Sequence, residues 1–177
     1  MKFYDRKEVK DILAYLRLIY NSSDPVSFLR IINTPSRKIG AKSLETLAHF
    51  RNSFGISFID VLESVDDIDD LRPVAKEALK WFYETFCILS EYSQKHSVSE
   101  LISEVISRVW YESYLRTQFS EVEYESKKEN LSELGNVASD YSGLEPRESL
   151  SLFLEEVALI SDLDSKDSES DTVTLMT

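Results

Sequence analysis

Glycine, proline, cysteine and histidine are all scarce in this sequence. Four glycines and four prolines among 177 residues are too few for the many tight turns of a β-sandwich or a β-barrel. The single cysteine, Cys87, excludes an internal disulfide, and with only His49 and His96 beside it the chain cannot assemble a zinc site from soft ligands. Charged residues interrupt every apolar run, so we expect neither a membrane span nor a signal peptide.

Positive charge is also in short supply. The chain has 20 Lys and Arg residues against 32 Asp and Glu residues, which gives a formal net charge of -12. This excess of negative charge opposes a general affinity for nucleic acid, because phosphate binding needs local positive charge. Any contact with nucleic acid must therefore be a small patch. The lack of paired cysteines favours a reducing cytoplasm.

Apolar residues make up 42% of the chain, enough for the core of one domain, and they recur at the spacing of amphipathic helices. We predict an all-α fold, an irregular bundle of about seven to nine helices. Between Gln118 and Glu129 the polar sequence is compatible with either a loop or an exposed helix start. The clearest helices are predicted to begin near Val9, at Pro25 after Asp24, after Gly40, near Pro73, at the capping box of Ser97 and Glu100, and at Pro146.

The two segments at the end of the chain differ from the rest. Residues 161–171 are acidic and serine-rich with a single apolar residue, so we expect a flexible linker there. Residues 172–177 alternate β-branched and apolar side chains as a strand does. A lone strand has no partner in a helical bundle, so the chain is expected to be cut from a larger protein.

Sequence motifs for catalysis and cofactor binding are absent. There is no Gly-rich phosphate loop ending in Gly-Lys-Ser/Thr and no Gly-x-Gly-x-x-Gly. The acidic run Asp66 to Asp70 suits a solvated helix start, His49 and His96 suit surface or packing positions, and Cys87 is expected to be a small buried hydrophobe. We therefore predict no catalytic, cofactor-binding or metal-binding residue in this chain, and a monomer.

The segment Thr34 to Ser43 is the most informative one for function. It lies between two predicted helices, contains Arg37, Lys38 and Lys42 without an acidic residue, and includes Gly40 just before the second helix. A glycine there allows the free amides of the helix start to approach a phosphate closely. Two interpretations remain open: a helix-hairpin-helix turn that holds a duplex by its backbone, or an ordinary basic turn between helices.

Several ordered blocks resemble one protein family. Residues 3–17 (FYDRKEVKDILAYLR), 30–40 (RIINTPSRKIG), 129–134 (ENLSEL) and 153–164 (FLEEVALISDLD) are similar to the inserted 2B subdomain of the UvrD/PcrA/Rep family of DNA helicases. Residues 173–177 (VTLMT) resemble the strand that leads into the family's fifth helicase motif. The similarity spans nearly the whole chain, although residues 55–110 match only in helical pattern.

The resemblance implies a division of the chain and a set of DNA contacts. Residues 1–11 would be the edge of the 2A motor domain, residues 12–160 the helical 2B subdomain, and residues 172–177 the strand returning to 2A. The family turn reads Gly-Ile-Gly and contacts duplex DNA through its amides. Here Lys38 replaces the first glycine and is expected to disfavour a left-handed backbone angle. The implied DNA-binding residues are Arg37, Lys38, Ile39, Gly40, Lys42 and Ser43.

The function that follows from the resemblance belongs to the parent protein. It would be an ATP-dependent 3′–5′ DNA helicase of the bacterial cytoplasm and nucleoid, acting in repair or replication, with ATP and Mg²⁺ bound outside this chain. The 2B subdomain would contact duplex DNA near a junction with single-stranded DNA and regulate unwinding by swivelling relative to the motor domains. The alternative is a protein-interaction or autoinhibitory module whose acidic surface is the docking face.

Overall fold

The fold follows the helical periodicity of the sequence. The computed structural model describes the backbone of residues 2–170 and the side chains of residues 2–161. Within these limits the chain is all-α, as predicted, with nine α-helices and no strand. Along the chain the elements are η1 (Phe3–Asp5), α1 (Lys7–Tyr20), α2 (Pro25–Ile31), α3 (Ala41–Phe54), α4 (Phe58–Glu63), η2 (Val65–Asp67), α5 (Pro73–Ser93), α6 (Val98–Arg108), α7 (Tyr111–Gln118), α8 (Glu121–Ser139) and α9 (Pro146–Ser170).

Side-chain caps fix the starts of four helices. The Asp24 carboxylate accepts hydrogen bonds from two amides at the start of α2, where Pro25 occupies the first helical position. Ser57, Ser97 and Ser120 each form a capping box with the acidic residue three positions later. The box at Ser120 shows that the polar segment 118–129 contains the start of α8 and is not simply a loop.

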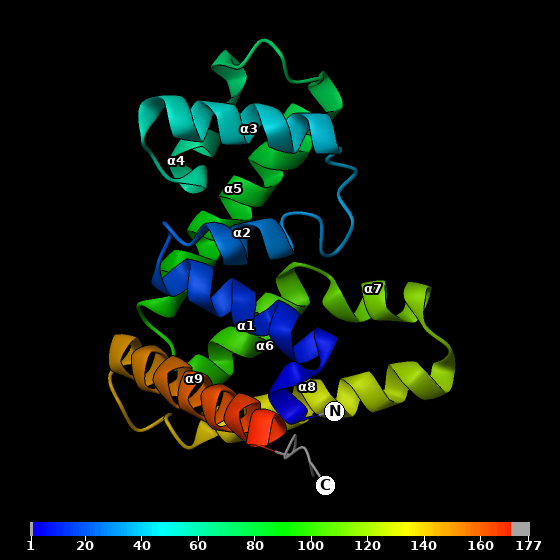
Figure 1. Cartoon of the computed structure of the whole chain (residues 1–177), viewed down its shortest axis with the longest axis vertical. Coiled ribbons are helices and arrows are strands. Elements are labelled where there is room, and N and C mark those ends of the chain that lie inside the picture. Colours follow the sequence, from blue (N-terminus) through cyan, green and yellow to red (C-terminus); the bar gives the residue numbers. More distant parts are fainter. Residues whose placement is uncertain (1, 171–177) are drawn as a thin grey trace, which may run out of the picture.

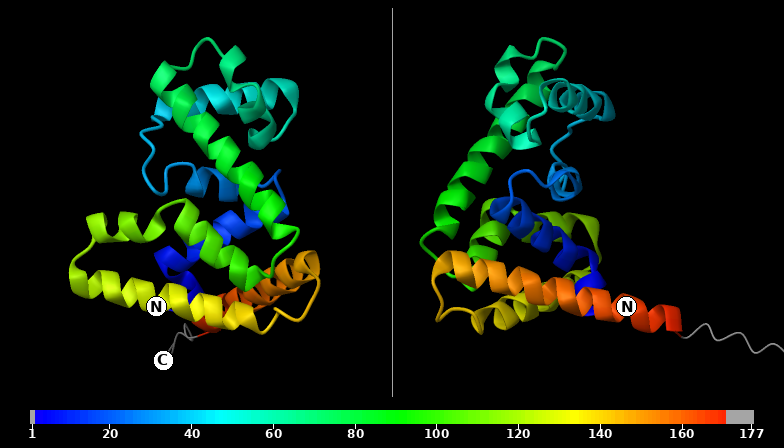
Figure 2. Two further views of the ribbon diagram at one scale, coloured as in Figure 1. Left: turned by 180° about the vertical axis from the view of Figure 1, so that it is seen from behind. Right: turned by 60° about the vertical axis from the view of Figure 1, so that its left-hand side comes forward.

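The long helix α5 connects two groups of helices. Figure 1 shows α3 and α4 beside the first half of α5 at the top of the view, and α1, α6 and α9 against its second half, with α8 packed on α1 and α6. Figure 2 shows the same division from two other sides, with the α2–α3 connection at the edge of the molecule. This connection is the segment that the sequence singles out, so the fold leaves it accessible.

Aromatic packing joins α2 to α4 and α5. The Phe28 ring of α2 stacks on Phe58 of α4 at a centroid distance of 4.4 Å and meets the edge of Phe82 of α5 at 5.8 Å. All three rings are buried in the continuous apolar core. Burial of such rings from water is the main favourable term in folding, and it fixes α2 against α4 and α5.

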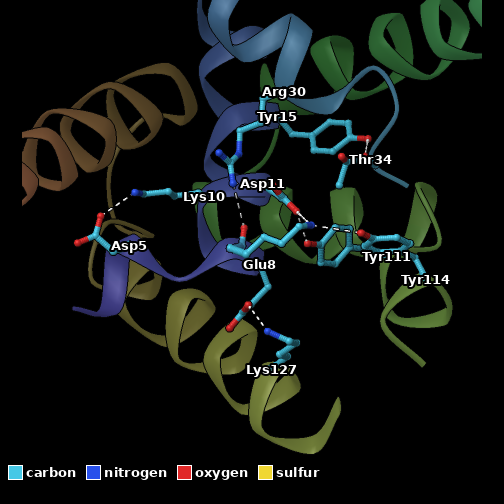
Figure 3. A network of polar contacts seen from close by, with 11 residues as sticks. Asp5, Glu8, Lys10, Asp11, Tyr15, Arg30, Thr34, Tyr111, Tyr114 and Lys127 are labelled. Carbon is cyan, nitrogen blue, oxygen red and sulfur yellow. Dashed lines mark hydrogen bonds and ion pairs between the residues drawn. The ribbon is translucent and has the colours of Figure 1, made fainter. Parts of the chain in front are cut away.

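Two buried carboxylates make α1 the hub of the bundle (Figure 3). The Asp11 side chain is only 2% exposed, yet it forms ion pairs with Arg30 of α2 and with Lys7, each at 2.8 Å. The Tyr111 hydroxyl of α7 donates a hydrogen bond to the same carboxylate at 2.7 Å. Burial and the adjacent Asp11 charge both raise the pKa of Tyr111, so this hydroxyl keeps its proton and remains a donor.

One helical turn earlier, Glu8 binds α8 in a similar way. Its carboxylate accepts a hydrogen bond from Asn130 at 2.6 Å and pairs with Lys127 at 3.0 Å. The carbonyl oxygen of the Asn130 side chain is bonded in turn by Arg6. Burial alone would raise the pKa of Glu8, but these bonds to its charged form hold the pKa below its ordinary value.

One expectation from the sequence is wrong in the described structure. Cys87 lies exposed on α5, because the apolar face of that helix passes through Phe82 and Leu89 and leaves position 87 outside. Helix α9 continues to Ser170, so the backbone of the segment expected to be a flexible linker is helical through residue 170. That segment contains no glycine or proline to end the helix. The predicted strand at 172–177 lies outside the described residues.

The buried network makes a prediction about stability. Replacing Asp11 by alanine should lower the free energy of unfolding by about 3 kcal/mol, because Lys7, Arg30 and the Tyr111 hydroxyl all lose their partner. The matched control is Asp5→Ala, which breaks an ion pair with Lys10 at the surface and should leave stability unchanged. Urea unfolding followed by circular dichroism measures both. Equal losses in the two variants would show that the Asp11 network does not stabilise the fold.

Candidate nucleic-acid interface

The connection between α2 and α3 is an ordered turn built around Asn33. The side-chain oxygen of Asn33 accepts hydrogen bonds from the amides of Arg37, at 3.3 Å, and Ile39, at 3.2 Å. Its side-chain nitrogen donates to the Ile39 carbonyl at 2.5 Å. The peptide bond between Thr34 and Pro35 is cis. One asparagine thus bonds the backbone on both sides of Lys38.

Lys38, at the position where the resemblance implies a glycine, has a left-handed backbone conformation. Its φ angle is 59°, and its side chain is exposed. Lysine thus adopts the geometry that it was expected to disfavour: the left-handed region is small but allowed for a residue with a Cβ, and the Asn33 bonds hold the backbone there despite the steric cost. The substitution also adds a positive charge at the tip of the turn.

Arg37 points into the protein, which the sequence did not indicate. One terminal nitrogen of its guanidinium donates to the carbonyls of Ile31 and Ile32 at 2.7 and 3.0 Å. The other donates to the Tyr15 hydroxyl at 2.7 Å. The guanidinium carbon lies 5.1 Å from the ring centroid of Trp81. These contacts direct the charge of Arg37 to the end of α2 rather than to the surface.

The other candidate residues divide into buried and exposed groups. The Ile39 and Ser43 side chains are buried, and their amides bond Asn33 and the Gly40 carbonyl. Lys42 is exposed on the first turn of α3. The structure therefore brings Lys38, Gly40 and Lys42 together on the outside of the turn and places Arg37, Ile39 and Ser43 inside it.

The start of α3 presents free amides at the same place. Gly40 is the N-cap of α3 and supplies no side-chain cap, and no residue in the described part of the chain accepts a hydrogen bond from the Gly40, Ala41 or Lys42 amide. The backbone of Gly40 is ordinary, with φ at -77°. A Cβ built there meets only a guanidinium nitrogen of Arg72, at 3.9 Å. The fold does not require glycine here, but its absent side chain leaves the amides open.

Arg72 is a neighbour that sequence reasoning missed. It is the N-cap of α5, exposed and 32 residues away from Gly40 in the chain, and the packing of α3 beside the start of α5 brings its guanidinium to the turn. No local pattern signals this contact, because it depends on how α3 and α4 fold back onto α5. Figure 1 shows the two helix starts at the same end of the bundle.

The exposed cations at the turn have no carboxylate partner among the described side chains. Among the described side chains, Lys38, Lys42 and Arg72 form no ion pair, although the chain has an excess of acidic residues. Elsewhere, carboxylates pair with Lys7, Lys10, Arg30, Lys80, Lys95, Arg108 and Lys127. Three uncompensated charges beside free amides form a small basic patch, the arrangement that an anion such as phosphate prefers.

A separate groove of about 650 Å³ lies between α6, α7 and α8. Its lining is rich in serine and includes Ile102, Ile106 and Lys128. Trp110 forms part of the wall and is 71% exposed. None of the predicted DNA-binding residues lines this groove, so it is distinct from the turn.

The left-handed angle at residue 38 makes a prediction about stability. Lys38→Gly should be more stable than Lys38→Ala by about 1 kcal/mol, because glycine reaches a positive φ without the steric cost that a Cβ imposes. Both substitutions remove the same charge, so each controls for the electrostatic effect of the other. Urea unfolding provides the comparison. Equal stability of the two variants would mean that residue 38 is not left-handed in solution.

Comparison with known proteins identifies the family of the chain. The family model for the UvrD-like helicase C-terminal domain matches residues 1–177. The chain is 40% identical over 182 residues to the ATP-dependent DNA helicase PcrA of Bacillus subtilis strain 168, an alignment that covers 99% of this chain and 24% of that protein. The PcrA proteins of Staphylococcus epidermidis strain RP62A and Staphylococcus aureus strain Mu50 are 40% and 39% identical over 178 residues, with the same coverage. The chain spans about a quarter of the length of these curated relatives and belongs to the UvrD-like helicase C-terminal domain family.

Proposed function

We propose that this chain is the 2B subdomain of an ATP-dependent 3′–5′ DNA helicase and that the outer face of its α2–α3 turn contacts duplex DNA. The observation that carries the proposal is the group of free amides at the start of α3, with the exposed Lys38 and Lys42 on either side of Gly40 in the chain and the Arg72 guanidinium beside it. The names of the relatives support the helicase assignment. On this proposal, residues 12–160 form 2B, and residues 1–11 and 172–177 connect it to the 2A motor domain.

The chemistry of the turn favours the DNA backbone over the bases. Free amides and ammonium or guanidinium groups bind phosphate oxygens, which are the same at every base pair. The outer face of the turn offers no buried side chain shaped to read a base edge. We therefore infer a contact that holds the duplex ahead of a single-strand junction without selecting its sequence.

ATP and Mg²⁺ belong to the rest of the parent protein on this proposal. Among the described residues, no group of His, Cys, Asp or Glu side chains could hold a metal ion. The sequence also lacks a phosphate-binding loop. This chain would contribute position and regulation, swivelling with the duplex relative to the motor domains, and the catalytic step would take place in those domains.

The basic patch predicts a measurable but weak affinity for duplex DNA. The triple variant Lys38→Ala, Lys42→Ala, Arg72→Ala should reduce binding to two unrelated duplexes equally, because phosphate contacts do not depend on sequence. It should also reduce the magnitude of the slope of log K against log salt by about 3, since each lost phosphate contact removes about 0.9. Fluorescence anisotropy at low salt measures both effects for the 177-residue chain, with wild-type Kd expected at about 10⁻⁴ to 10⁻⁶ M.

The matched control removes three cations from elsewhere in the bundle. Lys95→Ala, Lys128→Ala and Arg147→Ala change the net charge by the same amount, just after α5, on α8 and on α9. This control should keep the salt slope of the wild type. If both triple variants lose affinity and slope alike, the binding reflects overall charge, and the turn is not the contact.

A protein-interaction module is the second candidate function. The groove between α6, α7 and α8 favours it, because an exposed tryptophan beside a serine-rich hollow of about 650 Å³ is typical of a surface that a partner covers. The two functions use different surfaces and can coexist. A chain that binds no duplex at low salt would leave the groove as the better-supported functional site.

A further inference from the structure

We propose that Tyr15, Asn33 and Arg37 form an internal clamp that holds the α2–α3 turn in its duplex-binding geometry, and that Arg37 is a positioning residue rather than a phosphate ligand. The inference rests on the proposed duplex contact. It adds the side chains that order the turn before the duplex binds. Arg37 is an arginine in a basic turn, so its residue type alone suggests a DNA contact. Its role is here changed from binding phosphate to positioning the turn. The clamp is defined by these three side chains.

The guanidinium of Arg37 is already satisfied inside the protein. Its terminal nitrogens donate to the Ile31 and Ile32 carbonyls and to the Tyr15 hydroxyl. Carbonyls at the end of a helix lack partners within the helix and carry partial negative charge, so a cation placed there is stabilised. The rings of Trp81 and Phe82 lie 5.1 and 5.2 Å from the guanidinium carbon. A phosphate would have to compete with all of these contacts.

Tyr15 connects both ends of the turn to α1. Its hydroxyl donates to the Thr34 carbonyl at 2.8 Å and accepts the hydrogen bond from Arg37 at 2.7 Å (Figure 3 shows the contact with Thr34). The Tyr15 side chain is buried. It cannot touch a duplex on the surface, so any effect of Tyr15 on DNA binding must pass through the turn.

Asn33 completes the clamp at the residue that carries the outer charge. Its bonds to the Arg37 and Ile39 amides and to the Ile39 carbonyl enclose Lys38, the residue held at a φ of 59°. A turn that is ordered before binding loses less conformational entropy when it meets the duplex. The clamp therefore raises affinity without adding a contact to DNA.

The test uses one substitution that removes only an oxygen atom and one that keeps the charge. Tyr15→Phe deletes the hydroxyl that joins Thr34 to Arg37, and Arg37→Lys keeps a cation but loses the fork that bonds three acceptors. Each should weaken binding to a duplex about tenfold while leaving the salt slope unchanged, because Lys38, Lys42 and Arg72 are intact. Hydrogen exchange of the Ile39 amide, measured without DNA, should become faster in both variants.

Matched controls separate the clamp from general effects. Tyr20→Phe removes the same atom from the same helix, where the hydroxyl bonds Ser151 instead of the turn, and Arg147→Lys makes the same exchange of cations at an exposed position of α9. Both should bind as the wild type does. Urea unfolding identifies the range in which every variant is folded, and all affinities are compared within it.

The outcomes distinguish failure of the clamp from failure of the duplex contact. If Arg37→Lys and Tyr15→Phe bind as the wild type does, while the triple variant of Lys38, Lys42 and Arg72 loses affinity, the clamp proposal is overturned and the duplex contact stands. Unchanged exchange of the Ile39 amide in both variants also overturns it. If the triple variant binds like the wild type, the proposed function fails, and the exchange data alone then report whether the clamp orders the turn.

Discussion

The burial of two carboxylates on one face of α1 is the constraint on which the rest of the structure depends. Asp11 and Glu8 are almost inaccessible to water, and a buried charge is tolerated only when it is paired and hydrogen-bonded. Their partners come from α2, α7 and α8. The two carboxylates have their full set of partners only when α2, α7 and α8 all lie in the observed positions around α1. This requirement favours one arrangement of the bundle over others.

The same helix controls the candidate interface through its other polar contacts. Arg30 fixes α2 to α1, and Tyr15, one helical turn beyond Asp11, fixes the turn that follows α2. The Arg30 and Arg37 guanidinium groups already have partners inside the protein, Asp11 and Tyr15. The cations on the outside, Lys38, Lys42 and Arg72, have no carboxylate partner among the described residues and give an acidic chain its small basic patch.

The sequence predicts helices well because their signals are local. Asp24 with Pro25, and Ser97 with Glu100, identify helix starts from residues only one to three positions apart. The position of the turn is predictable for the same reason. The orientation of Arg37 is not, because its acceptors and rings include Tyr15 and Trp81, which lie 22 and 44 positions away. Arg72 reaches Gly40 only through the packing of α3 and α5, so no local pattern could assign it to the site.

The central claim is that the outer face of the α2–α3 turn binds the DNA backbone, and nuclear magnetic resonance tests it at the level of single amides. A duplex is titrated into the isotope-labelled chain at low salt, and the shifts of all backbone amides are followed in the wild type and in Gly40→Val. Valine fits the backbone of residue 40 but covers the amides at the start of α3. We expect the largest shifts at Lys38, Gly40, Ala41 and Lys42 in the wild type and their loss in the variant. Shifts centred on the groove between α6, α7 and α8, or equal shifts in both proteins, would contradict the account.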